Sequence, residues 1–301
     1  MASAEFHAFV ARQAANASPP PLTLIERRQH IDNAMSQLPL AAGTSAAETT
    51  VGGVRVMQCE RDGGQADPVL VWFHGGGYRL GSALAYRAFA SHLAAACHVR
   101  TVMVDYALAP ERPFPQAVQD GVEVCRALYN EGAASTRVVV GGDSAGGGLA
   151  VSVLVACRDE GLPLPAGGIC VSPWADLTNS GESYETRGQV DLLFSRAAAN
   201  EAAALYLGDH DPTDPMASPI FADLTGLPPL LILVGDAEVL LDDASALAER
   251  ARRGGVEVEH CVFVEMPHVW LTSYPAFPEA VKAVELMAAF IGRTTAVVAP
   301  G

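Results

Sequence analysis

The chain has 301 residues, half of them hydrophobic, which suits one large α/β domain with a modest lid. Its formal net charge is -15 and Lys282 is its only lysine, which argues against nucleic acid and anionic membrane as partners. No apolar run approaches the roughly 20 residues of a membrane span, and the N-terminus lacks the pattern of a secretory signal. The six cysteines are scattered. We therefore expect reduced, buried thiols and a cytoplasmic protein.

The pattern of the first 45 residues does not predict the start of a sheet. Glu5 to Ala15 and Leu22 to Leu38 carry apolar residues at helical spacing, separated by a break at Ser18 to Pro21. They predict a helical segment that precedes the sheet. Thr49 to Glu60 then predicts one or two strands, and Pro68 to Phe73 predicts the next.

Three consecutive glycines follow that strand, in His74-Gly75-Gly76-Gly77-Tyr78. Glycines there allow backbone N–H groups to turn toward a ligand oxygen. In an acyl-transfer enzyme such a loop is half of an oxyanion hole, and the other half is the N–H after the nucleophile. The expected donors are Gly76, Gly77 and Ala145. Taken alone, the motif could also be just a tight loop.

Strand and helix patterns continue to alternate along the chain. Ala83 to Cys97 predicts a helix, Val99 to Asp105 a strand, and residues 115–131 a further helix after a proline-rich loop. This alternation favours a mostly parallel sheet with helices on both faces.

A G-x-S-x-G motif, Gly142 to Gly146, lies between the β-branched run Val138 to Val140 and the apolar run Leu149 to Cys157. The motif alone is weak in a glycine-rich chain. A strand–turn–helix context is that of a nucleophile elbow, which holds a serine hydroxyl above the sheet edge. The sequence therefore predicts Ser144 as a nucleophile.

HGGGY, DYALAPERPFP and GDSAGG, in this order and spacing, resemble the hormone-sensitive-lipase family of α/β-hydrolases, in its bacterial carboxylesterase branch. The resemblance implies an eight-stranded α/β-hydrolase fold and no cofactor. It implies a helical cap at residues 1–45, a catalytic domain at 46–301 and a second cap segment at about 179–218. It also implies that His74, Glu111 and Asp120 are structural.

The general base in this family follows the nucleophile and the acid along the chain. Three histidines come after Ser144. His210 lies in an Asp/Pro-rich stretch and His260 inside the strand predicted at 256–264. His268 follows that strand, just before the last helix, and is the expected base.

The acid should follow the strand predicted at 229–234. Alignment with the family pattern on Leu240 and on Asp242-Asp243 puts Glu238 where the family usually has aspartate. Glutamate is chemically competent in such a triad. Asp236 and, less so, Asp242 remain alternatives.

Together these residues predict a serine carboxylesterase acting on short- to medium-chain, uncharged esters. A lactone hydrolase using the same triad is the alternative, and a ligand-binding relative is a second one, less favoured because His268 is present. We expect no metal and a small-molecule ester or lactone as partner. The resemblance also suggests a homodimer. The residues expected near an apolar substrate pocket are Tyr78, Leu80, Trp174, Val269 and Trp270, although Trp174 could equally pack in the core.

Overall fold

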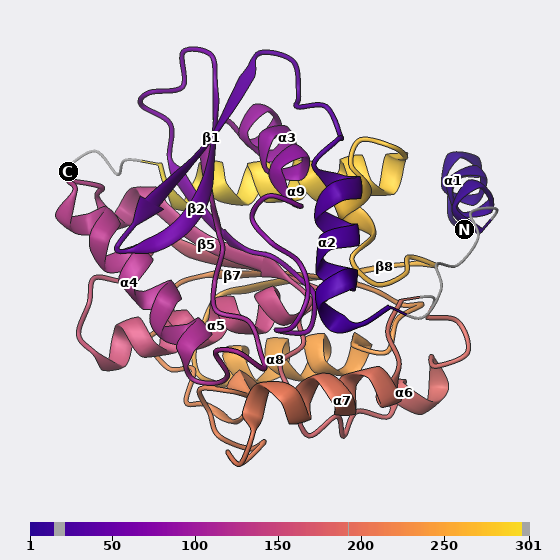
Figure 1. The fold of residues 1–301 in the computed structure, drawn as a ribbon. Helices are drawn as coiled ribbons and strands as arrows, with labels where there is room; N and C mark the ends of the chain where they lie inside the picture. Colours follow the sequence, from indigo (N-terminus) through magenta and orange to yellow (C-terminus); the bar gives the residue numbers. More distant parts are fainter. Residues whose placement is uncertain (15–21, 192, 297–301) are drawn as a thin grey trace.

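The computed structural model describes residues 1–14, 22–191 and 193–296, arranged around one eight-stranded sheet (Figure 1). The strands are β1 (Thr44–Val51), β2 (Val54–Arg61), β3 (Val69–Phe73), β4 (Arg100–Val104), β5 (Val138–Asp143), β6 (Gly167–Val171), β7 (Leu230–Gly235) and β8 (Val258–Phe263). Their order across the sheet is β1-β2-β4-β3-β5-β6-β7-β8. Only the β1–β2 and β2–β4 pairs are antiparallel. The predicted mostly parallel sheet is confirmed.

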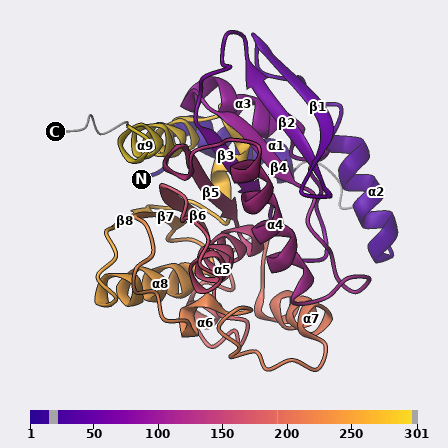
Figure 2. The same cartoon turned by 90° about the vertical axis from the view of Figure 1, so that its left-hand side faces the viewer.

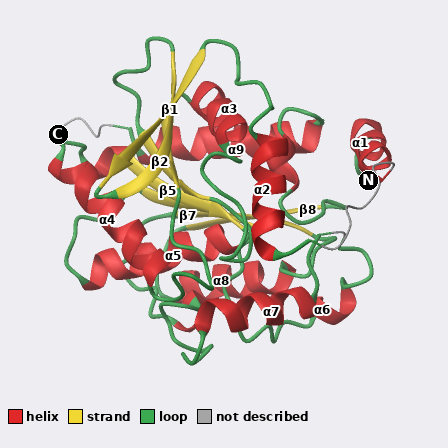
Figure 3. Ribbon diagram, in the orientation of Figure 1, coloured by secondary structure: helices red, strands yellow, loops and turns green. Residues whose placement is uncertain are grey.

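Helices cover both faces of the sheet (Figures 2 and 3). They are α1 (Ala4–Ala14), α2 (Leu24–Met35), α3 (Arg87–Cys97), α4 (Gln116–Asn130), α5 (Ala145–Asp159), α6 (Ser183–Thr186), α7 (Arg196–Leu207), α8 (Leu241–Arg253) and α9 (Pro278–Thr294), with short 3₁₀ turns η1 (Ser135–Arg137), η2 (Pro219–Phe221) and η3 (Trp270–Ser273). One core cluster joins the sheet to α4, α5, α7 and α8, and the other joins it to α3 and α9. Among the described residues, no helix is both long and apolar enough to cross a bilayer.

The central strands are buried on both faces. Every residue of β3, β5, β6 and β7 is buried, which explains their runs of valine, leucine and isoleucine where a one-sided strand would alternate. All six cysteines are free, and all but the half-buried Cys261 are buried. The expectation of reduced, mostly buried thiols agrees with this arrangement.

The expected helical segment before the sheet consists of α1 and α2. Its predicted break at Ser18 to Pro21 lies outside the described residues. Phe6 of α1 packs edge-on against Phe277, just before α9. In contrast, α2 buries none of its residues. The helix predicted to start at Ala83 begins at Arg87, because the backbone from Ser82 to Tyr86 forms a turn.

Candidate active site

Parallel strands bring distant segments to one edge of the sheet. β5 lies next to β3, β7 is separated from β5 by β6 alone, and β8 follows β7. Their carboxyl ends lead into the glycine loop at Gly75, into Ser144, into Glu238 and into His268 respectively. This edge is where open α/β sheets bind ligands.

Ser144 sits in a strained turn between β5 and α5, with φ 56° and ψ -123°. Non-glycine residues rarely adopt positive φ without a structural constraint. The constraint is close packing: a Cβ on Gly146 would collide with the carbonyl of Phe73, and one on Gly142 with the carbonyl of Gly146. The glycines of the motif thus allow the start of α5 to pack closely against β5 and the end of β3.

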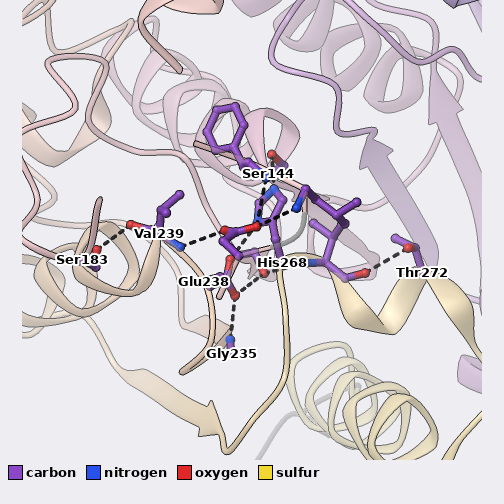
Figure 4. Close-up of polar contacts among 12 residues, drawn as sticks. Ser144, Ser183, Gly235, Glu238, Val239, His268 and Thr272 are labelled. Carbon is purple, nitrogen blue, oxygen red and sulfur yellow. Dashed lines mark hydrogen bonds and ion pairs between the residues drawn. The ribbon is translucent and has the colours of Figure 1, made fainter. Parts of the chain in front are cut away.

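Three side chains form a continuous hydrogen-bonded chain (Figure 4). His268 Nε2 lies 2.8 Å from Ser144 Oγ, and His268 Nδ1 lies 2.7 Å from Glu238 Oε2. A carboxylate only accepts hydrogen bonds. Nδ1 of a neutral His268 therefore carries the proton, which leaves Nε2 free to accept the serine proton.

Glu238 is completely buried and held by its second oxygen. Oε1 accepts hydrogen bonds from Ser172 Oγ at 2.8 Å and from the Gly235 N–H at 2.7 Å. The alternatives lie elsewhere: Asp236 accepts from the backbone N–H of Glu265, and Asp242 from that of Ser183.

Ser172 was not among the residues expected at the site. Besides binding Glu238, its hydroxyl oxygen accepts the Val269 N–H at 3.2 Å, so it joins the acid loop to the histidine loop. Ser172 has φ 46°. A single serine at the end of a strand carries no sequence signal for such a bridge.

Sequence reasoning also missed Phe194, which contacts His268, and Asp191, whose charge acts on it. The Phe194 ring stacks on the imidazole, with centroids 5.7 Å apart and planes at 16°. The Asp191 carboxylate accepts the N–H groups of Phe194 and of Val239, next to Glu238. Burial opposes a charged imidazole, but the hydrogen bond and charge of Glu238, with Asp191 and Asp143, outweigh it and raise the pKa of His268 above its ordinary value.

The glycine loop faces Ser144 across a cavity with a volume of about 210 Å³. Gly75, Gly76 and Gly77 line it together with Ser144 and His268. Gly76 has φ 124° and Gly77 φ 61°, and a Cβ on Gly76 would collide with the Leu80 carbonyl.

Two of the three expected oxyanion-hole donors, Gly76 and Gly77, line this cavity. In the described part of the chain no hydrogen bond is found from the N–H groups of Gly76 or Gly77. Ala145 is the first residue of α5, where a backbone N–H has no partner within the helix. His74 is buried, stacks on Tyr106 and binds the Gly75 carbonyl through Nδ1. This is the geometry of a structural side chain.

The residues expected to line the pocket divide into two groups. Leu80 and Val269 line the cavity with Ser144, and Val269 and Trp270 line a second, apolar cavity of about 360 Å³. Tyr78 and Trp174 line neither. Tyr78 stacks on Tyr206, and the Trp174 indole donates to Asn179, so both pack in the core instead.

The remaining candidates lie away from Ser144. His210 packs against Phe114, and His260 is half-buried on β8. Asp120 accepts the Ala107 N–H within the proline-rich loop, and Glu111 pairs with Arg28 of α2.

The chain is similar in sequence and structure to known ester hydrolases. Residues 70–272 match a family model described as an alpha/beta hydrolase fold. An acetyl-hydrolase of Streptomyces hygroscopicus is 46% identical over 226 residues, which cover 75% of this chain and 76% of that relative. An esterase of Acinetobacter venetianus is 35% identical over 226 residues, 75% of each chain.

Solved structures of esterases are also similar to this chain. A bacterial esterase of the hormone-sensitive lipase family is 40% identical, with a TM-score of 0.92 over 98% of this chain and 100% of the other. EstE5, soaked with p-nitrophenyl butyrate, is 37% identical with a TM-score of 0.92, over 98% and 99% of the two chains. From its fold, its motifs and these relatives, the chain belongs to the hormone-sensitive-lipase family of α/β-hydrolases.

Proposed function

We propose that this protein is a serine carboxylesterase that hydrolyses short- to medium-chain esters through an acyl-enzyme. The observation that carries the proposal is the hydrogen-bonded chain from Ser144 through His268 to Glu238, at a cavity lined by the glycine loop. The acetyl-hydrolase and esterase relatives support the same reaction class.

In the proposed mechanism, Ser144 Oγ attacks the ester carbonyl carbon while His268 Nε2 takes the serine proton. The carbonyl oxygen becomes an oxyanion, bound by the N–H groups of Gly76, Gly77 and Ala145. Glu238 stabilises the imidazolium that has formed. Collapse of the tetrahedral intermediate breaks the bond to the alcohol oxygen, which leaves with the proton from His268. Water then attacks the acyl-serine by the same steps and releases the acid.

The volumes of the two cavities support a preference for substrates of small to medium size. The one at Ser144 has a volume of about 210 Å³, and the apolar one of about 360 Å³ shares Leu193, His268 and Val269 with it. Phe6 and Phe9 of α1 line the apolar cavity. A short acyl group fits the first, and an apolar chain or leaving group of medium length fits the second.

The test is hydrolysis of p-nitrophenyl esters from acetyl to palmitoyl, with Ser144→Ala and Glu238→Ala measured in parallel. We expect activity to fall beyond medium chains, and Ser144→Ala to lose at least about 10⁴-fold in kcat. A fully active Ser144→Ala would refute the mechanism. Activity on lactones alone would replace the ester with a lactone as substrate.

A further inference from the structure

Asp143, the residue before the proposed nucleophile, has no role in the mechanism above and yet lines the same cavity as Ser144. It is completely buried at the end of β5. Buried carboxylates are costly unless hydrogen-bonded. Asp143 has two donors: Trp72 Nε1 lies 2.9 Å from Oδ1, and the Tyr86 hydroxyl lies 2.7 Å from Oδ2.

Tyr86 extends this contact to the glycine loop. Its hydroxyl oxygen accepts the Gly75 N–H at 3.1 Å. A hydroxyl has one proton, so donation to Asp143 leaves an oxygen lone pair for Gly75. Burial, together with the charge of Asp143, keeps the pKa of Tyr86 well above its ordinary value. Tyr86 therefore remains a neutral hydroxyl that can donate and accept at once.

The carbonyl groups of the His74–Gly75 peptide and of the Gly75–Gly76 peptide also have hydrogen-bond partners. The Tyr106 hydroxyl donates to the His74 carbonyl at 2.7 Å, and His74 Nδ1 lies 2.7 Å from the Gly75 carbonyl. Gly75 also packs directly on Asp143, because a Cβ there would collide with Oδ2. The peptide leading into Gly76 and Gly77 thus has a fixed position relative to β5.

Burial raises the pKa of Asp143 to about 6, although its two donors and His268 oppose this shift. Above that pH the group is an anion that accepts from both Trp72 and Tyr86. The ionised carboxylate then fixes the direction of the Tyr86 hydroxyl, and with it the acceptor offered to Gly75.

We propose that Asp143 and Tyr86 are positioning residues that hold the two halves of the oxyanion hole in register. Asp143 belongs to the strand that presents Ser144 and Ala145, and through Tyr86 it fixes the loop that presents Gly76 and Gly77. The inference rests on the proposed function. Since oxyanion donors act on the transition state, the pair affects kcat while leaving substrate binding largely unchanged.

The test compares Tyr86→Phe with the wild type on p-nitrophenyl acetate and measures inhibition by phenylboronic acid, which forms a tetrahedral adduct with an active serine. We expect kcat to fall about 10- to 100-fold with KM within about 2-fold, as for a misplaced catalytic donor. The inhibition constant of the boronic acid should rise in proportion to the loss in kcat/KM.

Tyr184→Phe is the matched control, because Tyr184 is also buried and its hydroxyl binds Asn179, away from the loop. It should retain wild-type kcat. Asp143→Asn is the second variant: its amide cannot accept from both Trp72 and Tyr86, so it should lose kcat in the same way even if Tyr86→Phe does not fold. A wild type inactive on all esters would refute the proposed function. An active wild type with unchanged kcat in folded Tyr86→Phe and Asp143→Asn would refute only the positioning role.

Discussion

Helices α2 and α7 both contribute to the cavity at Ser144, but different forces hold them. Arg27 of α2 and Ala198 of α7 line that cavity. α7 buries five residues, Ala199, Ala202, Ala203, Tyr206 and Leu207, and belongs to the larger core cluster. α2 buries none. The cavity wall formed by α7 is therefore continuous with the hydrophobic core, whereas the wall formed by α2 lies on the surface of the fold.

A single side chain makes most of the polar contacts of α2. Arg28 Nε donates to the Arg79 carbonyl at 2.8 Å, and Nη2 donates to the Ala109 carbonyl at 2.7 Å. Both of its terminal nitrogens bind Glu111, at 2.9 and 3.0 Å. Such a forked, charge-assisted contact is specific in geometry, yet its loss need not disturb the core.

The largest expected effect on stability comes from a substitution in α7. Tyr206 stacks on Tyr78 with centroids 3.7 Å apart and planes at 6°. Tyr206→Ala should lower the free energy of unfolding by about 3–5 kcal/mol in urea denaturation, because it leaves a cavity in the core. Tyr206→Phe is the control: its hydroxyl is buried without a partner in the described part of the chain, so its loss should cost little. An unchanged unfolding midpoint for Tyr206→Ala would contradict the core role of α7.

Arg28→Ala tests the attachment of α2. We expect kcat/KM to fall about 10-fold, because Arg27 and the cavity wall lose their fixed position. The unfolding free energy should change by no more than about 1–2 kcal/mol, since opening of a peripheral helix is local. Steady-state kinetics and urea denaturation measure the two effects. Arg28→Lys should not restore activity, as lysine lacks the planar fork. A large loss of global stability would show that α2 is part of the core after all.

Asp191, in the segment leading to α7, links that region to the proposed base. Its charge contributes to the raised pKa of His268. Since the base must be neutral, activity should rise with pH through a pKa above the ordinary histidine value of about 6.5. Asp191→Asn should move this acid limb of kcat/KM to lower pH. An acid limb that stays in place would show that Asp191 acts only through its backbone hydrogen bonds.

The smallest effect is expected at the start of α2. Thr23 and Glu26 form a capping box, in which each side chain binds the other's backbone N–H. Thr23→Ala should cost about 1 kcal/mol of helix stability. Hydrogen exchange should become faster in α2 alone, with the urea midpoint nearly unchanged. Equal acceleration in α7 would contradict the independence of the two helices.

The sequence alone was sufficient to predict the elements whose residues lie close together in the chain. The buried strands show as β-branched runs, and the elbow shows because Gly142 and Gly146 are required by close backbone packing. Alignment of one loop with the family pattern favoured Glu238 over Asp236 and Asp242, and Glu238 is the carboxylate that the structure places against His268. Its role as the acid stays a prediction until Glu238→Ala is measured.

Other contacts depend on distant segments that meet only in the fold. Ser172 and Asp191 reach the acid loop from 66 and 48 residues away, and the residues around each give no sign of the contact. The direction in which an aromatic side chain points after a turn also cannot be predicted from the local sequence. Tyr78, at φ 57°, turns toward Tyr206 and away from the cavity that its sequence position suggested.

The most direct test of the central claim is to mix the enzyme rapidly with p-nitrophenyl acetate and to digest the quenched protein for mass spectrometry. The proposed mechanism predicts an acetyl group on the peptide that contains Ser144, absent in Ser144→Ala. An acetyl group on another residue, or turnover that persists in Ser144→Ala, would contradict it.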